Sequence, residues 1–304
     1  MEKDKGEEEL VNIDEKGNYE NEEKKDVKEP KKQSKLNISI LLIIFLIIII
    51  VIYFIYKYNE KSHIELIITN NYEEMSQKAA DIIIELLKKK PNAILGLATG
   101  STPIGLYKIL IENNKSKLIS FKDVVTYNLD EYCDIPKNHG QSYYTYMNTN
   151  LFDHIDINKN NTHLPIGEGD SKLNAENYEK ELNKIKIDIQ LLGIGSNGHI
   201  GFNEPGTDFN MGVHEVILTE NTIKDNARFF ENDINKVPKK AITMGIKNIL
   251  DAETIILIAN GKNKANAIKN IISGVADKNI PASALNLHKG KVYVIVDKEA
   301  ASLL

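Results

Sequence analysis

Residues 187–205 read IDIQLLGIGSNGHIGFNEP, an apolar run that leads directly into a glycine-rich turn. A short, continuous apolar run is typical of a strand that is buried on both faces of a sheet. The glycines that follow let the backbone turn sharply and approach a ligand. His199, whose imidazole titrates near neutral pH, lies in this turn together with Glu204, which can orient it. The stretch therefore predicts a buried strand that ends in a catalytic loop, although a buried, satisfied histidine is the alternative for His199.

Similar apolar runs recur along the chain and alternate with amphipathic segments. The predicted strands are residues 64–69, 93–98, 124–129, 187–194, 254–259 and 292–296. Between the first two, Asn71 can cap a helix with Glu74 three residues later, and Pro91 ends it. This alternation predicts an α/β fold, a three-layer αβα sandwich around a mostly parallel, doubly wound, Rossmann-like sheet. In such sheets the ligand binds beyond the carboxyl ends of the strands.

Composition limits the classes of function. The chain has 304 residues, 42% hydrophobic and 27% charged, with a net charge of -5, which suits one or two folded domains. The small negative charge, without a basic stripe, argues against nucleic acid as a partner. Cys133 is the single cysteine, so an intrachain disulfide and a zinc site built from cysteines are excluded.

The first sixty residues differ from the rest. Residues 1–35 carry 12 acidic and nine basic side chains and few large apolar ones, which predicts a disordered charged tail. Residues 36–58 begin with a long uncharged run of mostly Ile and Leu, and at roughly 1.5 Å per residue such a run can cross a hydrocarbon core of about 30 Å. We therefore predict a single-pass transmembrane anchor, with a folded domain at 62–304. An unused apolar patch is the alternative.

A hydroxyl-rich loop follows the strand predicted at 93–98, namely Thr99-Gly100-Ser101-Thr102-Pro103. Gly100 permits a turn, Thr102 can cap a helix, and Pro103 suits the first helical position. Backbone N–H groups and hydroxyls then converge at one place, as in a phosphate site that needs no metal. Helix capping alone explains the same residues. The P-loop and dinucleotide glycine patterns are absent.

Three further charged side chains are candidates for the site. Asp130 leaves the strand at 124–129, where partial desolvation raises the pKa of a carboxyl group and makes it a candidate base; capping of a turn by Asp130 or Glu131 is the alternative. Arg228 lies among aromatic residues, which suggests a partly buried guanidinium suited to phosphate. Lys264 lies where the strand at 254–259 meets its helix.

Several motifs together resemble the glucosamine-6-phosphate deaminases of the glucosamine/galactosamine-6-phosphate isomerase family. They are LATGSTP at 97–103, NLDEY at 128–132, SYY at 142–144, GHIGFNEP at 198–205, RFF at 228–230 and VP at 237–238. The resemblance covers roughly residues 64–304, in the family's order and spacing. It implies deamination with aldose-ketose isomerisation: glucosamine 6-phosphate and water become fructose 6-phosphate and ammonia, with no cofactor or metal.

The resemblance also implies a role for each site residue. Asp130 would abstract the C2 proton, His199 would assist ring opening, and Glu204 would orient His199. Asn197 occupies a place where some members carry Asp, and activity is expected to survive this difference. The implied phosphate ligands are Gly100, Ser101, Thr102, Arg228 and Lys264. Some members are allosteric hexamers with basic residues soon after the Asn-Glu-Pro motif; residues 206–216 offer little positive charge, which predicts a non-allosteric enzyme.

Alternatives remain open at this point. A 6-phosphogluconolactonase-like hydrolase would share the sheet, the phosphate loop and the Gly-His turn, but that class lacks the NLDEY and FNEP pair because a lactone needs no C2 base. A non-catalytic, membrane-tethered sugar-phosphate sensor and a preference for galactosamine 6-phosphate are further possibilities, and the oligomeric state is open between monomer and homo-oligomer. Lysines before the apolar run favour a cytoplasmic N-terminus. Because sugar phosphates are made and used in the cytosol, we nevertheless predict a membrane-anchored protein whose catalytic domain faces the cytoplasm.

Overall fold

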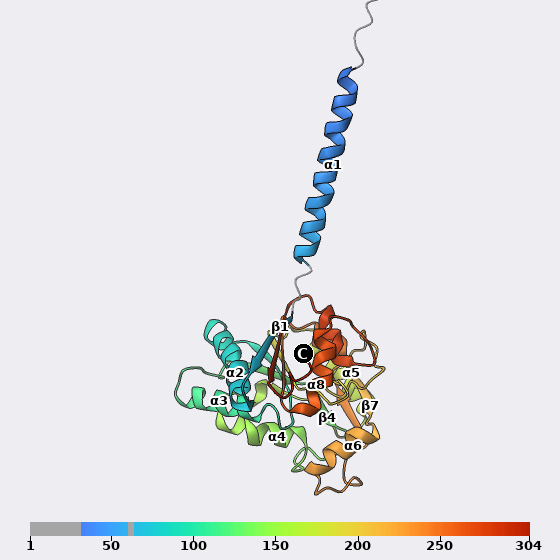
Figure 1. Cartoon of the computed structure of the whole chain (residues 1–304). Helices are drawn as coiled ribbons and strands as arrows, with labels where there is room; N and C mark the ends of the chain where they lie inside the picture. The colour runs from blue at the N-terminus through green and yellow to red at the C-terminus, as the bar shows by residue number, and fades with distance from the viewer. Residues whose placement is uncertain (1–31, 60–63) are drawn as a thin grey trace, which may run out of the picture. The chain divides into compact units, whose positions relative to one another are not determined.

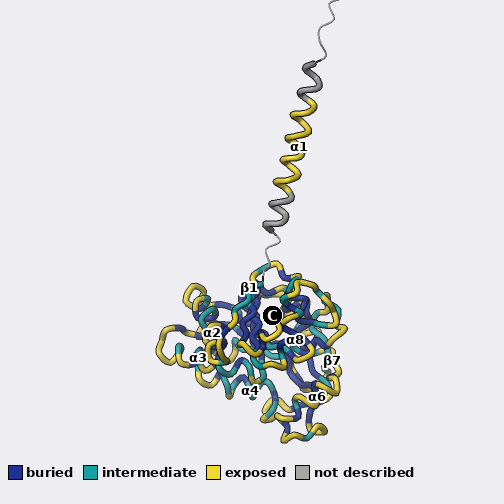
Figure 2. The backbone as a smooth tube through the Cα atoms, in the orientation of Figure 1, coloured by how far each residue is buried: buried dark blue, intermediate teal, exposed yellow. Residues whose placement is uncertain are grey.

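The computed structural model describes residues 32–59 and 64–304, with side chains described at 38–52 and 64–304. The chain divides into two compact units, Met1–Lys61 and Ser62–Leu304. In the first unit, helix α1 (Lys32–Asn59) carries exposed side chains at residues 38–52 (Figure 2). Residues 1–31 of the predicted tail lie outside the described residues, and the last residues of that predicted tail, 32–35, belong to α1 instead.

The membrane anchor predicted at residues 36–58 is not supported. In the part of the chain that the structure describes, no helix combines the length and the apolar character that crossing a membrane requires. The predicted single-pass, membrane-anchored localisation is therefore wrong on this finding.

A parallel sheet forms the centre of the second unit. Seven strands lie in the order β1-β10-β9-β6-β2-β3-β5, and every neighbouring pair is parallel. Their bounds are β1 Ile64–Thr69, β2 Ile94–Leu97, β3 Val125–Asn128, β5 Thr162–His163, β6 Ile189–Leu192, β9 Thr254–Ala259 and β10 Lys291–Asp297. The six strands predicted from apolar runs are all present, with ends that differ by a few residues. The α/β fold with a mostly parallel sheet is confirmed.

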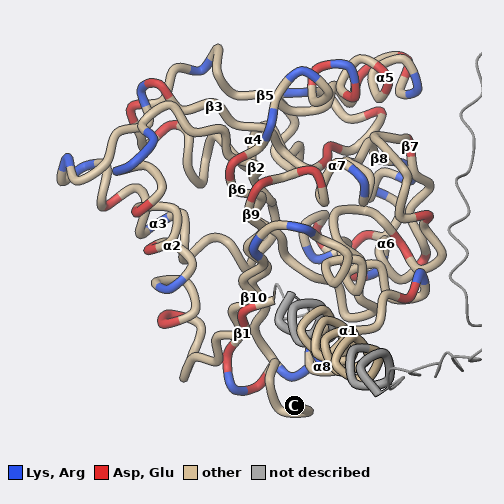
Figure 3. Tube along the Cα trace, turned by 90° about the horizontal axis from the view of Figure 1, so that it is seen from above, with Lys and Arg blue, Asp and Glu red and all other residues tan. Residues whose placement is uncertain are grey.

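Helices flank this sheet on both sides. Figure 3 shows α2 and α3 on one side of the strands and α7 and α8 on the other, as Figure 1 also shows for α2 and α8. The bounds are α2 Tyr72–Lys89, α3 Ile104–Lys115, α4 Tyr143–Asn150, α5 Ser171–Leu182, α6 Glu220–Asn226, α7 Ile246–Leu250 and α8 Ala265–Ile272. Figure 3 marks Lys and Arg residues and Asp and Glu residues on the trace, and both kinds occur in many parts of this unit.

Helix α2 follows from its sequence as predicted. The Asn71 side chain accepts a hydrogen bond from the Glu74 N–H at 2.9 Å, which caps the helix, and the helix ends before Pro91. Met75, Ala79 and Ile83 recur at helical spacing and are buried against the sheet. The core lies between the helical layers and includes the strand residues, whose tube is dark in Figure 2.

A second, antiparallel sheet was not predicted from the sequence. It has three strands in the order β4-β8-β7, with bounds β4 Asp130–Tyr132, β7 His214–Ile217 and β8 Lys240–Thr243. These strands are short, and charged residues interrupt their apolar pattern, so the sequence has no continuous apolar run that would predict them. Strand β4 follows β3 after one residue, so the second sheet continues the chain from the carboxyl edge of the first.

The direction of winding reverses between β2 and β6, which are neighbours in the sheet. From β2 the chain proceeds outward through β3 to β5, and then returns to β6 and continues the other way through β9 to β10. Loops that leave the carboxyl ends of strands on either side of such a point separate and leave a crevice. The fold therefore places a ligand site beyond β2 and β6.

Candidate active site

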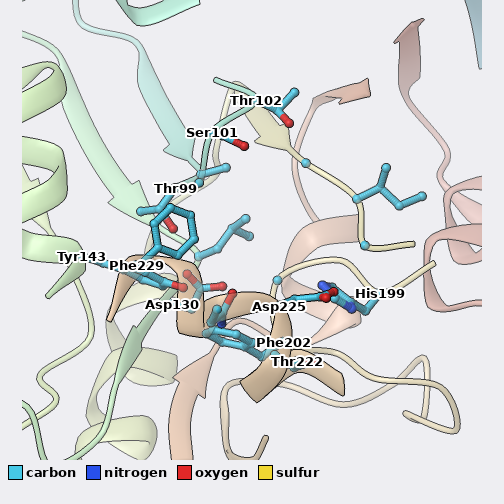
Figure 4. A pocket seen from close by; sticks show the side chains of 18 of the residues that line it. Thr99, Ser101, Thr102, Asp130, Tyr143, His199, Phe202, Thr222, Asp225 and Phe229 are labelled. Carbon is cyan, nitrogen blue, oxygen red and sulfur yellow. The ribbon is translucent and has the colours of Figure 1, made fainter. Parts of the chain in front are cut away.

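A cavity of about 420 Å³ opens at this place. The loops that follow β2, β3, β6 and β9 all contribute to its wall. Seven of the predicted site residues line it: Gly100, Ser101, Thr102, Asp130, His199, Arg228 and Lys264. Figure 4 shows Asp130 and His199 facing this space, with Ser101 and Thr102 at its far end. The other two predicted residues, Asn197 and Glu204, contact each other and lie next to His199.

Asp130 presents an unusual carboxyl group to the cavity. It is only 6% exposed, and burial, together with the nearby Glu131, raises its pKa to about 8. Within the described residues no hydrogen bond reaches its carboxyl oxygens, although its backbone is paired in β4. A carboxyl group with a raised pKa and no internal partner can exchange a proton with a bound molecule near neutral pH.

The neighbouring Glu131 has a different role. Its carboxylate accepts hydrogen bonds from the backbone N–H groups of Tyr132, Tyr143 and Tyr144, each at 2.9 Å. Two of these N–H groups belong to the first turn of α4, so Glu131 anchors the start of that helix. The capping role that the sequence left open for either carboxylate thus falls to Glu131, and Asp130 remains directed to the cavity.

His199 packs directly against the backbone of its own turn. A Cβ added to Gly195 would lie 2.3 Å from the imidazole ring, so only glycine fits there. Burial lowers the pKa of His199, Lys264 lowers it further, and the carboxylates of Glu204 and Asp225 oppose this shift. The imidazole is therefore neutral near pH 7, a state in which one ring nitrogen donates and the other accepts a hydrogen bond.

Glu204 is held at both carboxylate oxygens. Its Oε2 lies 3.8 Å from His199 Nδ1 and accepts a hydrogen bond from the Asn197 amide at 2.9 Å. Its Oε1 accepts hydrogen bonds from the hydroxyls of Thr222 and Thr219. The Asn197 side chain thus contacts the Glu204 carboxylate rather than the imidazole ring. Its Oδ1 accepts a hydrogen bond from the backbone N–H of His199 at 3.2 Å.

Hydrogen bonds from two tyrosine hydroxyls hold the loop after β2 in place. Tyr146 donates to the Gly100 carbonyl at 2.6 Å, and Tyr72 donates to the Thr102 carbonyl at 3.0 Å. Gly100 has a φ of +98°, the left-handed region that favours glycine. The prediction that Thr102 caps a helix is wrong: α3 begins after Pro103 without a side-chain cap, and the Thr102 hydroxyl donates to Asn260 instead, at 3.2 Å.

Two cations reach the cavity from different elements. Arg228 lies in the short 3₁₀ helix η3 (Ala227–Phe229), with its guanidinium Cζ 4.7 Å from the centre of the Phe229 ring. The guanidinium was expected to be partly buried, but Arg228 is exposed, because Phe230 rather than Phe229 turns into the core. Lys264 is half-buried, and burial lowers its pKa, as does Arg228, against the opposing effect of Asp225.

The antiparallel sheet joins the two halves of the site. Thr243 of β8 pairs with Asp130 of β4, and its hydroxyl accepts a hydrogen bond from the Phe202 N–H at 3.1 Å. The buried Asn203 donates to the Met244 carbonyl at 2.8 Å. The end of β8 is thus bonded both to the strand that carries Asp130 and to the turn that carries His199.

Other residues of the cavity wall were not singled out from the sequence. Among them are Thr99, Tyr143, Phe202, Thr222 and Asp225. Thr99, Tyr143 and Phe202 lie inside recognised motifs and could have been found there. Thr222 and Asp225 lie on a short polar helix, where nothing in the local pattern distinguishes them from solvent-exposed residues.

The family model that matches this chain covers residues 70–294 and describes glucosamine-6-phosphate isomerases and 6-phosphogluconolactonase. The chain belongs to this family. A glucosamine-6-phosphate deaminase of Thermoanaerobacter sp. (strain X514) is 52% identical over 243 residues, which cover 79% of this chain and 95% of the relative. A glucosamine-6-phosphate deaminase of Clostridium novyi (strain NT) is 49% identical over 243 residues, which cover 79% of this chain and 100% of the relative.

Solved structures of the family share the fold. A monomeric glucosamine-6-phosphate deaminase has a TM-score of 0.77 and 45% sequence identity, over 79% of this chain and 100% of that chain. The 6-phosphogluconolactonase from Trypanosoma brucei has a TM-score of 0.66 and 22% identity, over 79% of this chain and 98% of that chain. The second likeness concerns the fold alone.

Proposed function

We propose that this chain is a glucosamine-6-phosphate deaminase, which converts glucosamine 6-phosphate and water to fructose 6-phosphate and ammonia. The observation that carries the proposal is the convergence of Asp130, His199 and two cations on one cavity. The deaminases that are about half identical to the chain over 243 residues support the same reaction.

Ring opening is the first step, and His199 is suited to it. The ring oxygen of the pyranose must gain a proton while the C1 hydroxyl loses one. A neutral imidazole, which burial favours here, can accept a proton and then return it. Glu204, next to Nδ1, stabilises the imidazolium that exists between these two transfers.

Isomerisation then moves one proton between two carbons. Asp130 takes the proton from C2 of the open-chain sugar. The C2 electron pair forms a double bond to C1, the π electrons of the C1 carbonyl move to O1, and O1 takes up a proton released by the substrate's ammonium group, which gives an enolamine. Return of the proton to C1 leaves an imine at C2, to which water adds, and ammonia leaves with formation of the C2 ketone. Because burial raises the pKa of Asp130 to about 8, the carboxylate is basic enough to accept the proton and acidic enough to give it back.

The phosphate binds at the other end of the cavity. Ser101 and Thr102 offer hydroxyls there, Gly100 lets the backbone approach, and α3 begins directly behind this loop. Arg228 and Lys264 supply positive charge to the same space. Contacts so far from the reacting carbons orient the sugar, which lowers the barrier by several kcal/mol in model reactions.

Residues 206–216 support a non-allosteric enzyme. The charged side chains of this stretch are engaged locally: Asp208 pairs with Lys278 at 2.6 Å, and Glu215 pairs with Lys240 at 3.3 Å. His214 Nδ1 lies 2.8 Å from the Gly212 carbonyl. No lysine or arginine occurs in the stretch to hold a second sugar phosphate, so we expect hyperbolic kinetics, unchanged by N-acetylglucosamine 6-phosphate.

The test is an assay of the full chain with three substrates. We expect ammonia and fructose 6-phosphate in equal amounts from glucosamine 6-phosphate, a slower reaction with galactosamine 6-phosphate, and no hydrolysis of 6-phosphogluconolactone. Acid release from the lactone without ammonia from the amino sugar would refute the proposal. Tight binding of glucosamine 6-phosphate without turnover would refute it in favour of a sugar-phosphate sensor.

A further inference from the structure

Two threonine hydroxyls hold the carboxylate that faces His199. Thr222 and Thr219 both donate to Oε1 of Glu204, and the two hydroxyls are 3.1 Å from each other. Thr222 is only 4% exposed, and Glu204 is 8% exposed. This is therefore a buried network, in which hydrogen bonds to a charged group are worth more than at the surface.

The hydroxyls and the amide act on opposite oxygens of one carboxylate. Asn197 holds Oε2 at 2.9 Å, and the threonines hold Oε1, so the plane of the carboxylate is fixed. In this setting Oε2 lies 3.8 Å from Nδ1 of His199, slightly beyond a hydrogen bond, and Nδ1 is buried without another partner. A small rotation of either group decides whether Nδ1–H meets Oε2.

The threonines come from a segment that also reaches the phosphate end of the cavity. Thr219 caps α6, Thr222 lies in its first turn, and Arg228 follows in η3. The groups that orient His199 through Glu204 therefore share one short piece of chain with a cation of the phosphate site. Neither threonine was recognised from the sequence, because its role depends on contact with a turn at 199–204.

We propose that Thr222, assisted by Thr219, is a positioning residue for His199 that acts through Glu204. This role rests on the proposed deaminase function, because the imidazole matters only if it moves protons during ring opening. By fixing Oε1, the threonine hydroxyls keep Oε2 directed at Nδ1. That arrangement favours the tautomer with a proton on Nδ1 and leaves Nε2 as the acceptor that faces the cavity.

The charged groups around His199 set the direction of the expected effect. Glu204 from its own turn and Asp225 from α6 raise the pKa of His199, whereas Lys264 from the segment after β9 lowers it. Loss of the Thr222 hydroxyl lets the Glu204 carboxylate turn away from Nδ1. The pKa of His199 then falls further below its ordinary value, and the preference for the Nδ1–H tautomer weakens.

The experiment compares Thr222→Val, Thr222→Ser and, as a matched control, Thr149→Val, in which the exposed Thr149 lies outside the cavity. Titration of the His199 ring nitrogens by NMR in the full chain, assigned with a His199→Gln variant, reports the pKa and the tautomer without any substrate. For Thr222→Val we expect a lower His199 pKa, a mixed tautomer and a kcat about tenfold lower at unchanged KM. Thr222→Ser should restore all three, and Thr149→Val should match the wild type.

Several results would overturn this inference. One is a His199 titration that is unchanged, or shifted upward, in Thr222→Val. Another is an equal disturbance in Thr222→Ser, which would indicate a structural role for the methyl group. If Thr222→Val does not fold, Thr222→Ala takes its place, because it removes the same hydroxyl and leaves the α6 cap at Thr219 intact. Since the NMR readout needs no turnover, failure of the deaminase assay alone would refute the proposed function and leave the positioning result intact.

Discussion

Asp130 and Thr243 lie directly opposite each other in the antiparallel sheet, and the Thr243 hydroxyl accepts the Phe202 N–H at 3.1 Å. One threonine therefore joins the strand of the candidate base to the turn of the candidate histidine. The two candidate catalytic side chains come from different elements, Asp130 from β4 and His199 from the turn after β6, and a third element, β8, fixes one against the other.

The pH dependence of kcat/KM should follow Asp130. A base acts only when it is deprotonated, and burial raises the pKa of Asp130 to about 8, so kcat/KM should rise with pH and level off above about 8. Burial lowers the pKa of His199 below its ordinary value, so the titration of this imidazole does not produce the rise near pH 8. Steady-state rates, measured between about pH 5.5 and about pH 9.5 at steps of roughly one pH unit or less, give this profile.

A change at Glu131 provides the check on that assignment. Glu131→Gln removes the negative charge that helps to raise the pKa of Asp130, so the rise in kcat/KM should move to lower pH. The amide keeps one acceptor oxygen, which can serve the Tyr132 and Tyr143 N–H groups, and loses the hydrogen bond from the Tyr144 N–H. A profile that stays in place, or that moves upward, would contradict Asp130 as the titrating base.

Asp130→Asn should make the protein more stable at alkaline pH. The folded state holds a proton on Asp130 up to about pH 8, whereas the unfolded chain releases it near the ordinary pKa of 3.8. The free energy of unfolding of the wild type therefore decreases as pH rises between these values. We expect Asp130→Asn to exceed the wild type by on the order of 2 kcal/mol at pH 8 and to equal it below about pH 4, measured by urea unfolding.

The phosphate site predicts a difference between two neighbouring lysines. Lys264 lines the cavity, whereas Lys262, two residues earlier, is exposed and does not line it. Lys264→Ala should raise KM for glucosamine 6-phosphate roughly tenfold or more, because a half-buried cation that meets the phosphate is lost. Lys262→Ala should leave KM within about twofold, since exposed charges contribute little. Equal effects of the two changes would remove Lys264 from the phosphate site.

The fit of His199 against its turn can be tested at Gly195. A methyl group there would lie 2.3 Å from the imidazole, so Gly195→Ala should displace the ring and reduce kcat at least about a hundredfold. Gly140→Ala is the control, because a Cβ at Gly140 meets nothing within 4 Å. Wild-type turnover in Gly195→Ala would show that the position of the ring is not critical.

The parallel sheet was predictable because each of its longer strands is buried on both faces and reads as an apolar run, as residues 187–194 show. The antiparallel sheet was not, because β4 is only Asp130–Tyr132 and its pairing depends on a partner more than a hundred residues away. Likewise the sequence suggested that Thr102 caps a helix, whereas its hydroxyl reaches Asn260, which follows β9, on the other side of β6. Contacts of this kind depend on tertiary structure, and local patterns carry no signal for them.

The membrane anchor was predicted from the apolar character and the length of residues 36–58 as a whole. In the part of the chain that the structure describes, no helix has the length and the apolar character of such a span. By contrast, most of the predicted site residues line one cavity, because motifs that follow neighbouring parallel strands meet at one edge of the sheet, while Arg228 reaches it from η3.

The most direct measurement follows the hydrogen at C2 of glucosamine 6-phosphate. With substrate deuterated at C2, the full chain should release one ammonia for each fructose 6-phosphate formed, more slowly than with unlabelled substrate, and should lose the label from C2. The Asp130→Asn variant should do none of this, yet should still bind the sugar phosphate. Ammonia release that continues in Asp130→Asn, or that occurs while the label stays on C2, would contradict the account.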